Sequence, residues 1–218
     1  MSHKLVALSS AVDHIKDGMT IMIGGFMGVG TPEAIIDQIV ARGIKNLTVI
    51  ANDNAMPGVG IGKLITNRLV TKTIATHIGL NPETGQQMIA KELEVELIPQ
   101  GTLAERIRAA GAGIGGFLTP TGVGTEVADG KQIIVLDEIA YLLELPLKAD
   151  VAIIRGSVVD MQGNIQYHGT TRNFNPIMAT AADIVIVEAE TLVEVGEMDA
   201  NHIVTPGLFI DYIVRGGE

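Results

Sequence analysis

The chain has 218 residues, of which 47% are apolar and 18% charged, and its formal net charge at pH 7 is −10. This length suits one large domain with a substantial core, so we predict a single domain over residues 1–218. The acidic charge opposes binding to nucleic acid, and an aromatic content of 3% without tryptophan leaves few stacking surfaces for single strands.

The sequence also bears on compartment and on metals. It contains no cysteine, which excludes disulfides and thiol catalysis and fits a reducing cytoplasm. Residues 1–11 lack the apolar segment of a signal peptide, and no run of about 18 apolar residues is present for a membrane span. The histidines show no metal-ligand spacing, so no metal is expected. We expect a cytoplasmic protein without membrane or nucleic-acid partners, and the apolar composition favours a buried subunit interface.

The first half of the chain alternates predicted helices and strands. Apolar spacing predicts a helix over residues 5–16 and strands over 19–23 and 47–51. Between these strands, Thr31 and Pro32 are expected to begin a helix that ends at Gly43. The same pattern continues with a helix at 59–67, a strand at 71–76, a helix begun by Asn81-Pro82, a strand at 95–98 and a helix opened by 99–102. Such crossovers join parallel strands, so the predicted fold class is α/β, an open, mostly parallel twisted sheet flanked by helices.

A glycine-rich loop, GGFMGVG at residues 24–30, joins the first strand to the next helix. A loop in this position can present backbone N–H groups and a helix N-terminus to a phosphate. Its spacing differs from the dinucleotide fingerprint G-x-G-x-x-G, and it lacks the lysine of a P-loop. A tight strand-to-helix turn without a ligand is the alternative.

Polar residues follow two of the predicted strands. Asn52-Asp53-Asn54 comes directly after the strand at 47–51, and the carboxyl ends of parallel strands line the ligand crevice of such sheets. An Asx turn or a cap for the helix at 59–67 is the alternative. Gln100 follows the strand at 95–98, and its amide can donate to a thioester oxygen without adding charge. A helix cap is the alternative for Gln100.

A second glycine-rich stretch covers residues 109–125, which include six glycines and no charged residue. We predict a loop kept bare of side chains, so that its backbone N–H groups can approach a phosphate or a developing oxyanion. An ordinary glycine-rich loop is the alternative.

The remainder of the chain offers no convincing nucleophile. We expect a hairpin over 132–144, a strand at 149–155, a turn at 162–164, a helix capped by Asn175, a strand at 183–187 and extended segments at 202–204 and 208–214. No serine lies in a G-x-S-x-G elbow. Glu126, Glu138 and Glu188 lie in no motif and are expected to be solvated or capping acids.

Several segments together resemble the alpha subunit of the family I coenzyme A transferases of the acetate or butyrate–acetoacetate and 3-oxoacid type. The resemblance covers almost the whole chain, and the stretch at 96–125 is its most specific part. The segments are IMIGGFMGVGTPE (21–33), LTVIANDN (47–54), HIGLNPETG (77–85), ELIPQGTLAERIRAAGAGIGGFLTPTGVGT (96–125), KADVAIIRGSVVDMQGN (148–164) and NHIVTPGLFIDYIV (201–214).

The resemblance implies an enzyme that moves CoA between a short-chain acyl-CoA and a carboxylic acid by a ping-pong route. Such enzymes combine alpha and beta subunits, often as an α2β2 heterotetramer, and a glutamate of the beta subunit forms a glutamyl-CoA thioester. CoA is therefore expected as a substrate, and no permanently bound cofactor is expected. The acyl donor would be acetoacetyl-CoA or butyryl-CoA, and acetate is an example of the acceptor acid.

The resemblance also assigns roles to individual residues. Gln100 matches a glutamine near the thioester oxygen, and Asn52 matches an asparagine near the substrate. One departure is Asp53, because some 3-oxoacid members have two adjacent asparagines where this chain has Asn52-Asp53. A carboxylate that pointed inward there would repel an anionic acid. The residues expected to bind CoA are Gly24, Gly25, Phe26, Met27, Gly28, Val29 and Gly30 in the first loop and Gly113, Gly115, Gly116 and Phe117 in the second.

Two other function classes remain open from the residues alone. One is a stand-alone phosphosugar isomerase with a related fold, which would need a base and a cationic phosphate clamp, whereas both glycine loops lack lysine and arginine. The other is a non-catalytic CoA- or nucleotide-responsive regulator. The net charge of −10 opposes a DNA-binding form of this regulator.

Overall fold

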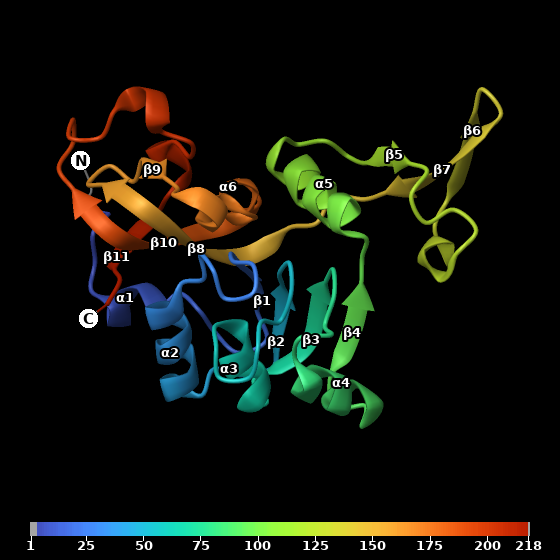
Figure 1. Ribbon diagram of the computed structural model, residues 1–218, viewed down its shortest axis with the longest axis horizontal. Helices are drawn as coiled ribbons and strands as arrows, with labels where there is room; N and C mark the ends of the chain where they lie inside the picture. The colour runs from blue at the N-terminus through green and yellow to red at the C-terminus, as the bar shows by residue number, and fades with distance from the viewer. Residues whose placement is uncertain (1–3, 218) are drawn as a thin grey trace.

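The computed structural model describes residues 4–217 and contains one large, mostly parallel sheet (Figure 1). Its strands lie in the order β11-β10-β8-β1-β2-β3-β4, with all neighbours parallel, and a short strand β9 pairs antiparallel with β8. The bounds are β1 (Thr20–Ile23), β2 (Leu47–Ile50), β3 (Val70–Ala75), β4 (Glu94–Leu97), β8 (Ala149–Asp160), β9 (Ile165–Gln166), β10 (Ala182–Val193) and β11 (Tyr212–Arg215). The predicted α/β class with a mostly parallel sheet is confirmed.

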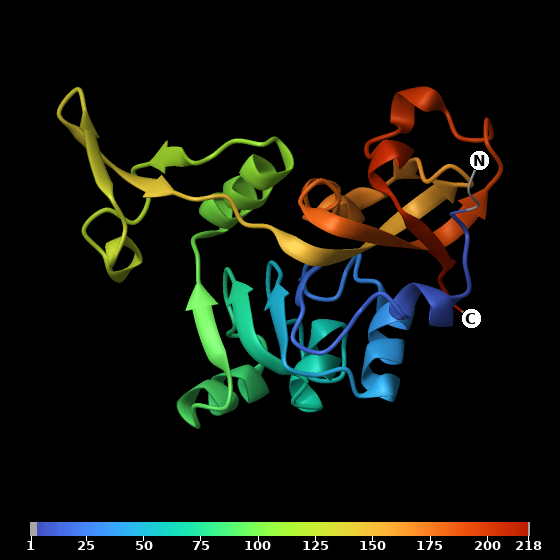
Figure 2. The same cartoon turned by 180° about the vertical axis from the view of Figure 1, so that it is seen from behind.

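Helices cover both faces of this sheet (Figures 1 and 2). The helices are α1 (Leu8–Val12), α2 (Glu33–Arg42), α3 (Ile61–Thr66), α4 (Pro82–Ile89), α5 (Gln100–Gly111) and α6 (Asn175–Met178). Successive side chains of a strand point to opposite faces, and β1 shows this directly. Ile21 and Ile23 join the core formed with α1–α3, whereas Met22 joins the core formed with α5 and α6.

Local sequence patterns predict some ends of helices and strands correctly and others incorrectly. Asn81 caps α4 as predicted, because its side chain accepts hydrogen bonds from the N–H groups of Glu83 and Thr84. Gly43 ends α2 with a left-handed φ of 63°. The predicted helix over 5–16 is wrong in extent, since α1 covers only Leu8–Val12. Strands β8 and β10 are each 12 residues long, far beyond the predicted 149–155 and 183–187, because they pair with each other along nearly their whole length.

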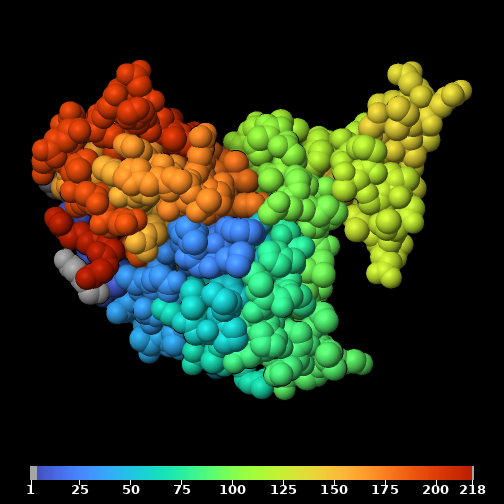
Figure 3. All heavy atoms as spheres, in the orientation of Figure 1, coloured from blue at the N-terminus to red at the C-terminus, as the bar shows by residue number. Residues whose placement is uncertain are grey.

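A second, three-stranded antiparallel sheet, β5 (Phe117–Thr119), β7 (Ile139–Glu144) and β6 (Ile133–Leu136), projects from the body (Figures 1 and 3). The predicted hairpin is confirmed, and its turn places Asp137 and Glu138 at φ values of 49° and 65°. Strand β5 lies within the stretch 109–125 that we predicted as loop. Within residues 4–217, no helix has both the length and the apolar character needed to cross a membrane.

Candidate functional site at the carboxyl edge of the sheet

Four neighbouring strands of the main sheet, β1 to β4, end at the same edge because they run parallel. The segments that leave this edge carry the glycine loop 24–30 after β1, Asn52-Asp53 after β2, His77 after β3 and Gln100 after β4. Ligand crevices of open parallel sheets lie at such an edge. The topology therefore gathers residues that are up to 76 positions apart in the sequence.

A continuous chain of hydrogen bonds joins the polar side chains at this edge. Gln100 donates from Nε2 to Asn52 Oδ1 at 2.7 Å, and Asn52 donates from Nδ2 to Asp53 Oδ2 at 2.9 Å. Asp53 also accepts from the backbone N–H of Met27 at 3.0 Å and of Ala55 at 2.7 Å. Asn52 and Asp53 are buried, whereas Gln100 is exposed at the end of this chain. The structure thus brings Asn52 and Gln100 into direct contact.

For the polar triplet after β2, the Asx turn is confirmed, whereas a place in a ligand crevice stays a prediction. Asp53 forms this turn, since it accepts from the N–H of Ala55, two residues ahead. Asn54 is buried and binds Thr73 and Thr84. The alternative for Gln100 is wrong, because its side chain bonds Asn52 and makes no cap hydrogen bond to α5.

The glycine loop 24–30 forms a tight hairpin. Phe26 and Val29 exchange two backbone hydrogen bonds across Met27 and Gly28, which have φ values of 52° and 87°. The Phe26 ring lies 6.4 Å from the His77 ring, centre to centre, so the loop tip extends over the end of β3.

The glycines of this loop serve packing more than access. A Cβ atom at Gly24 would lie 1.8 Å from Asn175 Oδ1, and one at Gly25 would lie 2.1 Å from Thr31 Oγ1. Both glycines and Gly30 are buried, whereas the side chains of Phe26, Met27 and Val29 are exposed at the tip. The loop therefore presents apolar side chains to its surroundings rather than a bare backbone.

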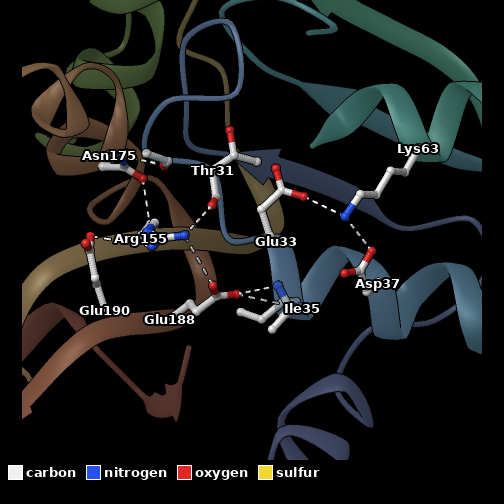
Figure 4. Close-up of polar contacts among 11 residues, drawn as sticks. Thr31, Glu33, Ile35, Asp37, Lys63, Arg155, Asn175, Glu188 and Glu190 are labelled. Carbon is white, nitrogen blue, oxygen red and sulfur yellow. Dashed lines mark hydrogen bonds and ion pairs between the residues drawn. The ribbon is translucent and has the colours of Figure 1, made fainter. Parts of the chain in front are cut away.

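The N-terminus of α2, which follows this loop, is occupied by a carboxylate of the chain itself (Figure 4). Glu188 Oε2 accepts from the N–H groups of Ala34 at 2.9 Å and Ile35 at 3.2 Å. The expected cap by Thr31 is wrong, because Pro32 is the N-cap residue and no local side chain caps the helix. An anionic ligand at this helix end would have to displace Glu188, so the expected phosphate geometry does not hold here.

Burial dominates the electrostatics of Glu188. Its side chain is almost completely buried, and this burial raises its pKa above the ordinary value of 4.5. The N–H of Ile35, the Arg155 guanidinium and the N–H of Ala34 offset part of the effect, whereas the nearby Glu33 adds to it. Arg155 lies 3.7 Å from Glu188 and 3.4 Å from Glu190 (Figure 4). Glu188 is therefore a capping acid, as expected.

The second glycine stretch lies at the other end of α5 from Gln100. Gly113 lies two residues past the end of this 12-residue helix, whose length is about 18 Å at 1.5 Å per residue. A Cβ atom at Gly113 or Gly115 would meet no atom within 4 Å, so this segment does present open backbone. Gly116 packs against the carbonyl oxygen of Glu144. The length of α5 thus keeps Gly113 apart from the Asn52–Gln100 pair.

The chain returns from this loop toward the start of α5. A surface hollow of about 240 Å³ is lined by Gly101, Thr102 and Glu105 of α5 together with Phe117, Thr119 and Thr121. Phe117 begins β5 and is half-buried. Phe117, one of the predicted residues of this loop, therefore lies near the N-terminal turn of α5.

Sequence reasoning missed one side chain that supports the site. Asn175 was expected to cap a helix, but it lies inside the first turn of α6 and makes no cap. Its Oδ1 accepts from the N–H of Arg155, and its Nδ2 donates to the carbonyl oxygens of Gly30 and Thr171. It therefore ties the glycine loop to β8, and no local pattern around residue 175 indicates this distant partner.

The chain has close relatives among known proteins. The family model described as "Coenzyme A transferase" matches residues 6–216. The acetate CoA-transferase subunit alpha of Escherichia coli (strain K12) is 55% identical over 218 residues, which cover 100% of this chain and 99% of the relative. The alpha subunit of the acetoacetyl-CoA:acetate/butyrate CoA transferase of Clostridium acetobutylicum is 55% identical over 215 residues, which cover 99% of each chain.

Solved structures share the fold. An acyl-CoA transferase of E. coli O157:H7, solved as a thioester complex with CoA, superimposes with a TM-score of 0.85 at 21% identity. The match covers 98% of this chain but 47% of that one, so this chain spans about half its length. Glutaconate coenzyme A-transferase of Acidaminococcus fermentans gives a TM-score of 0.83 at 22% identity, over 97% of this chain and 75% of that one. By its family match and its near-complete alignment with relatives at 55% identity, this chain belongs to the coenzyme A transferase family.

Proposed function

We propose that this chain is the alpha subunit of a CoA-transferase that moves CoA between a short-chain acyl-CoA and a carboxylic acid such as acetate. Acetoacetyl-CoA or butyryl-CoA is the proposed donor. The two relatives at 55% identity support this assignment, because one is named an acetate CoA-transferase and the other an acetoacetyl-CoA:acetate/butyrate CoA transferase. The family match disfavours a stand-alone phosphosugar isomerase and a non-catalytic regulator.

The observation that carries the proposal is the exposed Gln100 amide at the sheet edge. It is held by Asn52, while the one acidic group bonded into the same hydrogen-bond chain, Asp53, already accepts three hydrogen bonds. This edge therefore supplies a donor for an oxyanion and an acid whose oxygens are already engaged. Of the acids considered as nucleophiles, Glu126 begins a short 3-10 helix, Glu138 lies in the β6–β7 turn and Glu188 caps α2.

The attacking carboxylate would accordingly come from a partner, the beta subunit of the transferase. A glutamate of that partner exchanges with the acyl-CoA, so that the acid leaves with one glutamate oxygen and CoA remains as a glutamyl thioester. A second acid reverses the exchange. Gln100 would donate to the oxygen of the thioester carbonyl, where negative charge develops, and one such donor is worth a few kcal/mol.

The expected CoA contacts are part of the proposal. Open backbone at Gly113 and Gly115 supports a CoA path along the second loop, with Gly116 and Phe117 beside it. In the first loop, the exposed side chains of Phe26, Met27 and Val29 would make the contact. The buried Gly24, Gly25 and Gly30, together with Gly28 beside Val59, would shape this loop. Asn52 would act on the substrate through Gln100, because it is buried behind that residue.

We also propose one domain over residues 1–218, since both cores share the main sheet, and an α2β2 assembly in the cytoplasm. The test is to assay this chain, a CoA-transferase beta subunit and their mixture for CoA transfer from acetoacetyl-CoA to acetate. Activity is expected only in the mixture, and the native mass of the complex gives the stoichiometry. Full turnover by this chain alone would overturn the two-chain proposal.

A further inference from the structure

We propose that Asp53 is a positioning residue that, through Asn52, fixes which end of the Gln100 amide faces the reacting carbonyl. The inference rests on the proposed function, because it concerns the donor that this function needs. It does not require Asp53 to touch the substrate.

The direction of the hydrogen-bond chain begins at Asp53. An ionised carboxylate only accepts hydrogen bonds, and this one accepts from two backbone N–H groups, of Met27 and Ala55. The remaining partner is the Asn52 side chain, whose Nδ2 donates to Asp53 Oδ2 at 2.9 Å. The opposite orientation of Asn52 would place its carbonyl oxygen against the carboxylate, with no proton between them. Asp53 therefore sets the orientation of Asn52.

The same logic passes from Asn52 to Gln100. With its Nδ2 turned to Asp53, Asn52 presents Oδ1 to Gln100, and that oxygen lies 2.7 Å from Gln100 Nε2. A flipped Gln100 would place two carbonyl oxygens in contact. Asn52 thus accepts one amide hydrogen of Gln100. The second amide hydrogen remains free to bond an oxygen at the exposed end of the hydrogen-bond series. Without the acceptor at residue 53, both amides are able to flip together, and the exposed end then presents an oxygen in place of a donor.

The structure also removes the objection that a carboxylate here would repel an anionic acid. Asp53 is only 3% exposed, and both of its oxygens face N–H donors of the protein. Its bond to Met27 N–H additionally ties the tip of the glycine loop to the end of β2. An asparagine at this position would have both a donor and an acceptor, so Asn52 could either donate to it or accept from it. The carboxylate only accepts, and Asn52 must therefore donate.

The chain offers a matched control at Asp160. This residue is also 3% exposed, and it too accepts from two backbone N–H groups, of Gln162 and Asn164, and from an asparagine Nδ2, that of Asn164. Asp160→Asn therefore carries the general cost of this exchange in a turn that has no link to Gln100. Asp53→Asn should have the same effect on stability, and it also removes the carboxylate that can only accept from Asn52.

The experiment uses the assembled two-chain enzyme and measures single-turnover formation of the enzyme-CoA thioester. Asp53→Asn should lower the rate about twofold or more, because two similarly favoured orientations leave the donor in place about half of the time. KM for acyl-CoA should change little, and Asp160→Asn should leave the rate unchanged. The double variant Asp53→Asn/Gln100→Ala should be no slower than Gln100→Ala alone, because both changes remove the same donor. A normal rate in Asp53→Asn, or losses that multiply in the double variant, would overturn the proposal.

A second readout does not depend on activity. In the complex with only this chain labelled with ¹⁵N, the side-chain amide signals of Asn52 and Gln100 are assigned from their loss in Asn52→Ala and Gln100→Ala. Asp53→Asn should shift both signals, and Asp160→Asn should shift neither. Unmoved signals would refute the positioning role. A wild-type complex that transfers no CoA would instead refute the proposed function, while the amide signals would still decide the role of Asp53.

Discussion

The amide of Gln100 donates a 2.7 Å hydrogen bond to the buried side chain of Asn52, which lies 48 residues earlier in the chain. One residue opens α5 after β4, and the other follows β2. Their contact exists because parallel strands end together at one edge of the sheet. It leaves the Gln100 amide both exposed and fixed in orientation.

Replacement of Gln100 by alanine should lower the rate of thioester formation about ten- to a thousandfold, because an oxyanion donor is lost. Assembly with the partner subunit should be unchanged. The measurement is single-turnover kinetics together with the native mass of the complex. Gln86→Ala, a change of another exposed glutamine on α4, is the control and should have a normal rate. A normal rate in Gln100→Ala would exclude Gln100 from the site.

A bulky polar side chain at Gly115 should weaken CoA binding if CoA passes along the second glycine loop. Gly115 meets nothing within 4 Å and its φ is not positive, so Gly115→Gln should not change the melting temperature. We expect KM for acyl-CoA to rise about three- to thirtyfold, which corresponds to about 0.7–2 kcal/mol. Gly85→Gln, an equally open position within α4, is the control. An unchanged KM would argue against a CoA path at this loop.

Removal of the Glu188 side chain should destabilise the fold. Glu188→Ala leaves the N–H groups of Ala34 and Ile35 without their acceptor, and the loss of a helix cap typically costs about 0.5–2 kcal/mol. Glu190→Ala is a matched control, because Glu190 pairs with the same Arg155 but is mostly exposed, so it should cost less than about 1 kcal/mol. Denaturant unfolding of both variants decides this. Equal costs would show that capping by Glu188 contributes little.

The stability difference between the wild type and Glu188→Gln should depend on pH. Because burial raises the folded-state pKa of Glu188 above 4.5, its titration favours the folded state at low pH. This contribution to the free energy of unfolding is complete at pH values below the ordinary pKa of 4.5, and it is lost as pH rises through the folded-state pKa. The glutamine variant lacks this titration. Its free energy of unfolding, relative to that of the wild type, should therefore increase as pH rises through the folded-state pKa of Glu188. Chemical unfolding at a series of pH values measures the difference, and a constant difference would contradict the raised pKa.

The parts of the fold that rest on neighbouring residues were predictable from the sequence. The Asn81-Pro82 cap, the left-handed Gly43 and the hairpin turn at Asp137-Glu138 each depend on a few adjacent positions. The start of α2 was not predictable in this way. Its cap comes from Glu188, which lies 154 positions after Ala34 and is placed by the pairing of β10 with β8.

The candidate site likewise has features that the sequence predicts and features that depend on distant contacts. Asn52 and Gln100 were named from the resemblance and from their places after strands, and the structure puts them in contact. The expectation that the first loop brings a phosphate to the N-terminus of α2 failed, because Glu188 occupies that helix end. Gly24 and Gly25 are instead required by the close approach of Asn175 and Thr31, whose positions no local pattern gives. The role of Asp53 was equally hidden, since its acceptors face Met27 and Asn52 only after β1 and β2 have paired.

The link between Glu188 and the start of α2 also has a consequence for synthesis. As the polypeptide leaves the ribosome, α2 emerges about 150 residues before the carboxylate that completes its first turn. The nascent N-terminal half therefore carries the start of α2 without the acceptor for its Ala34 and Ile35 N–H groups, and contacts of such long sequence separation are slow to form. A ribosome stalled before residue 188 would hold a chain in which the first turn of α2 still lacks its carboxylate acceptor.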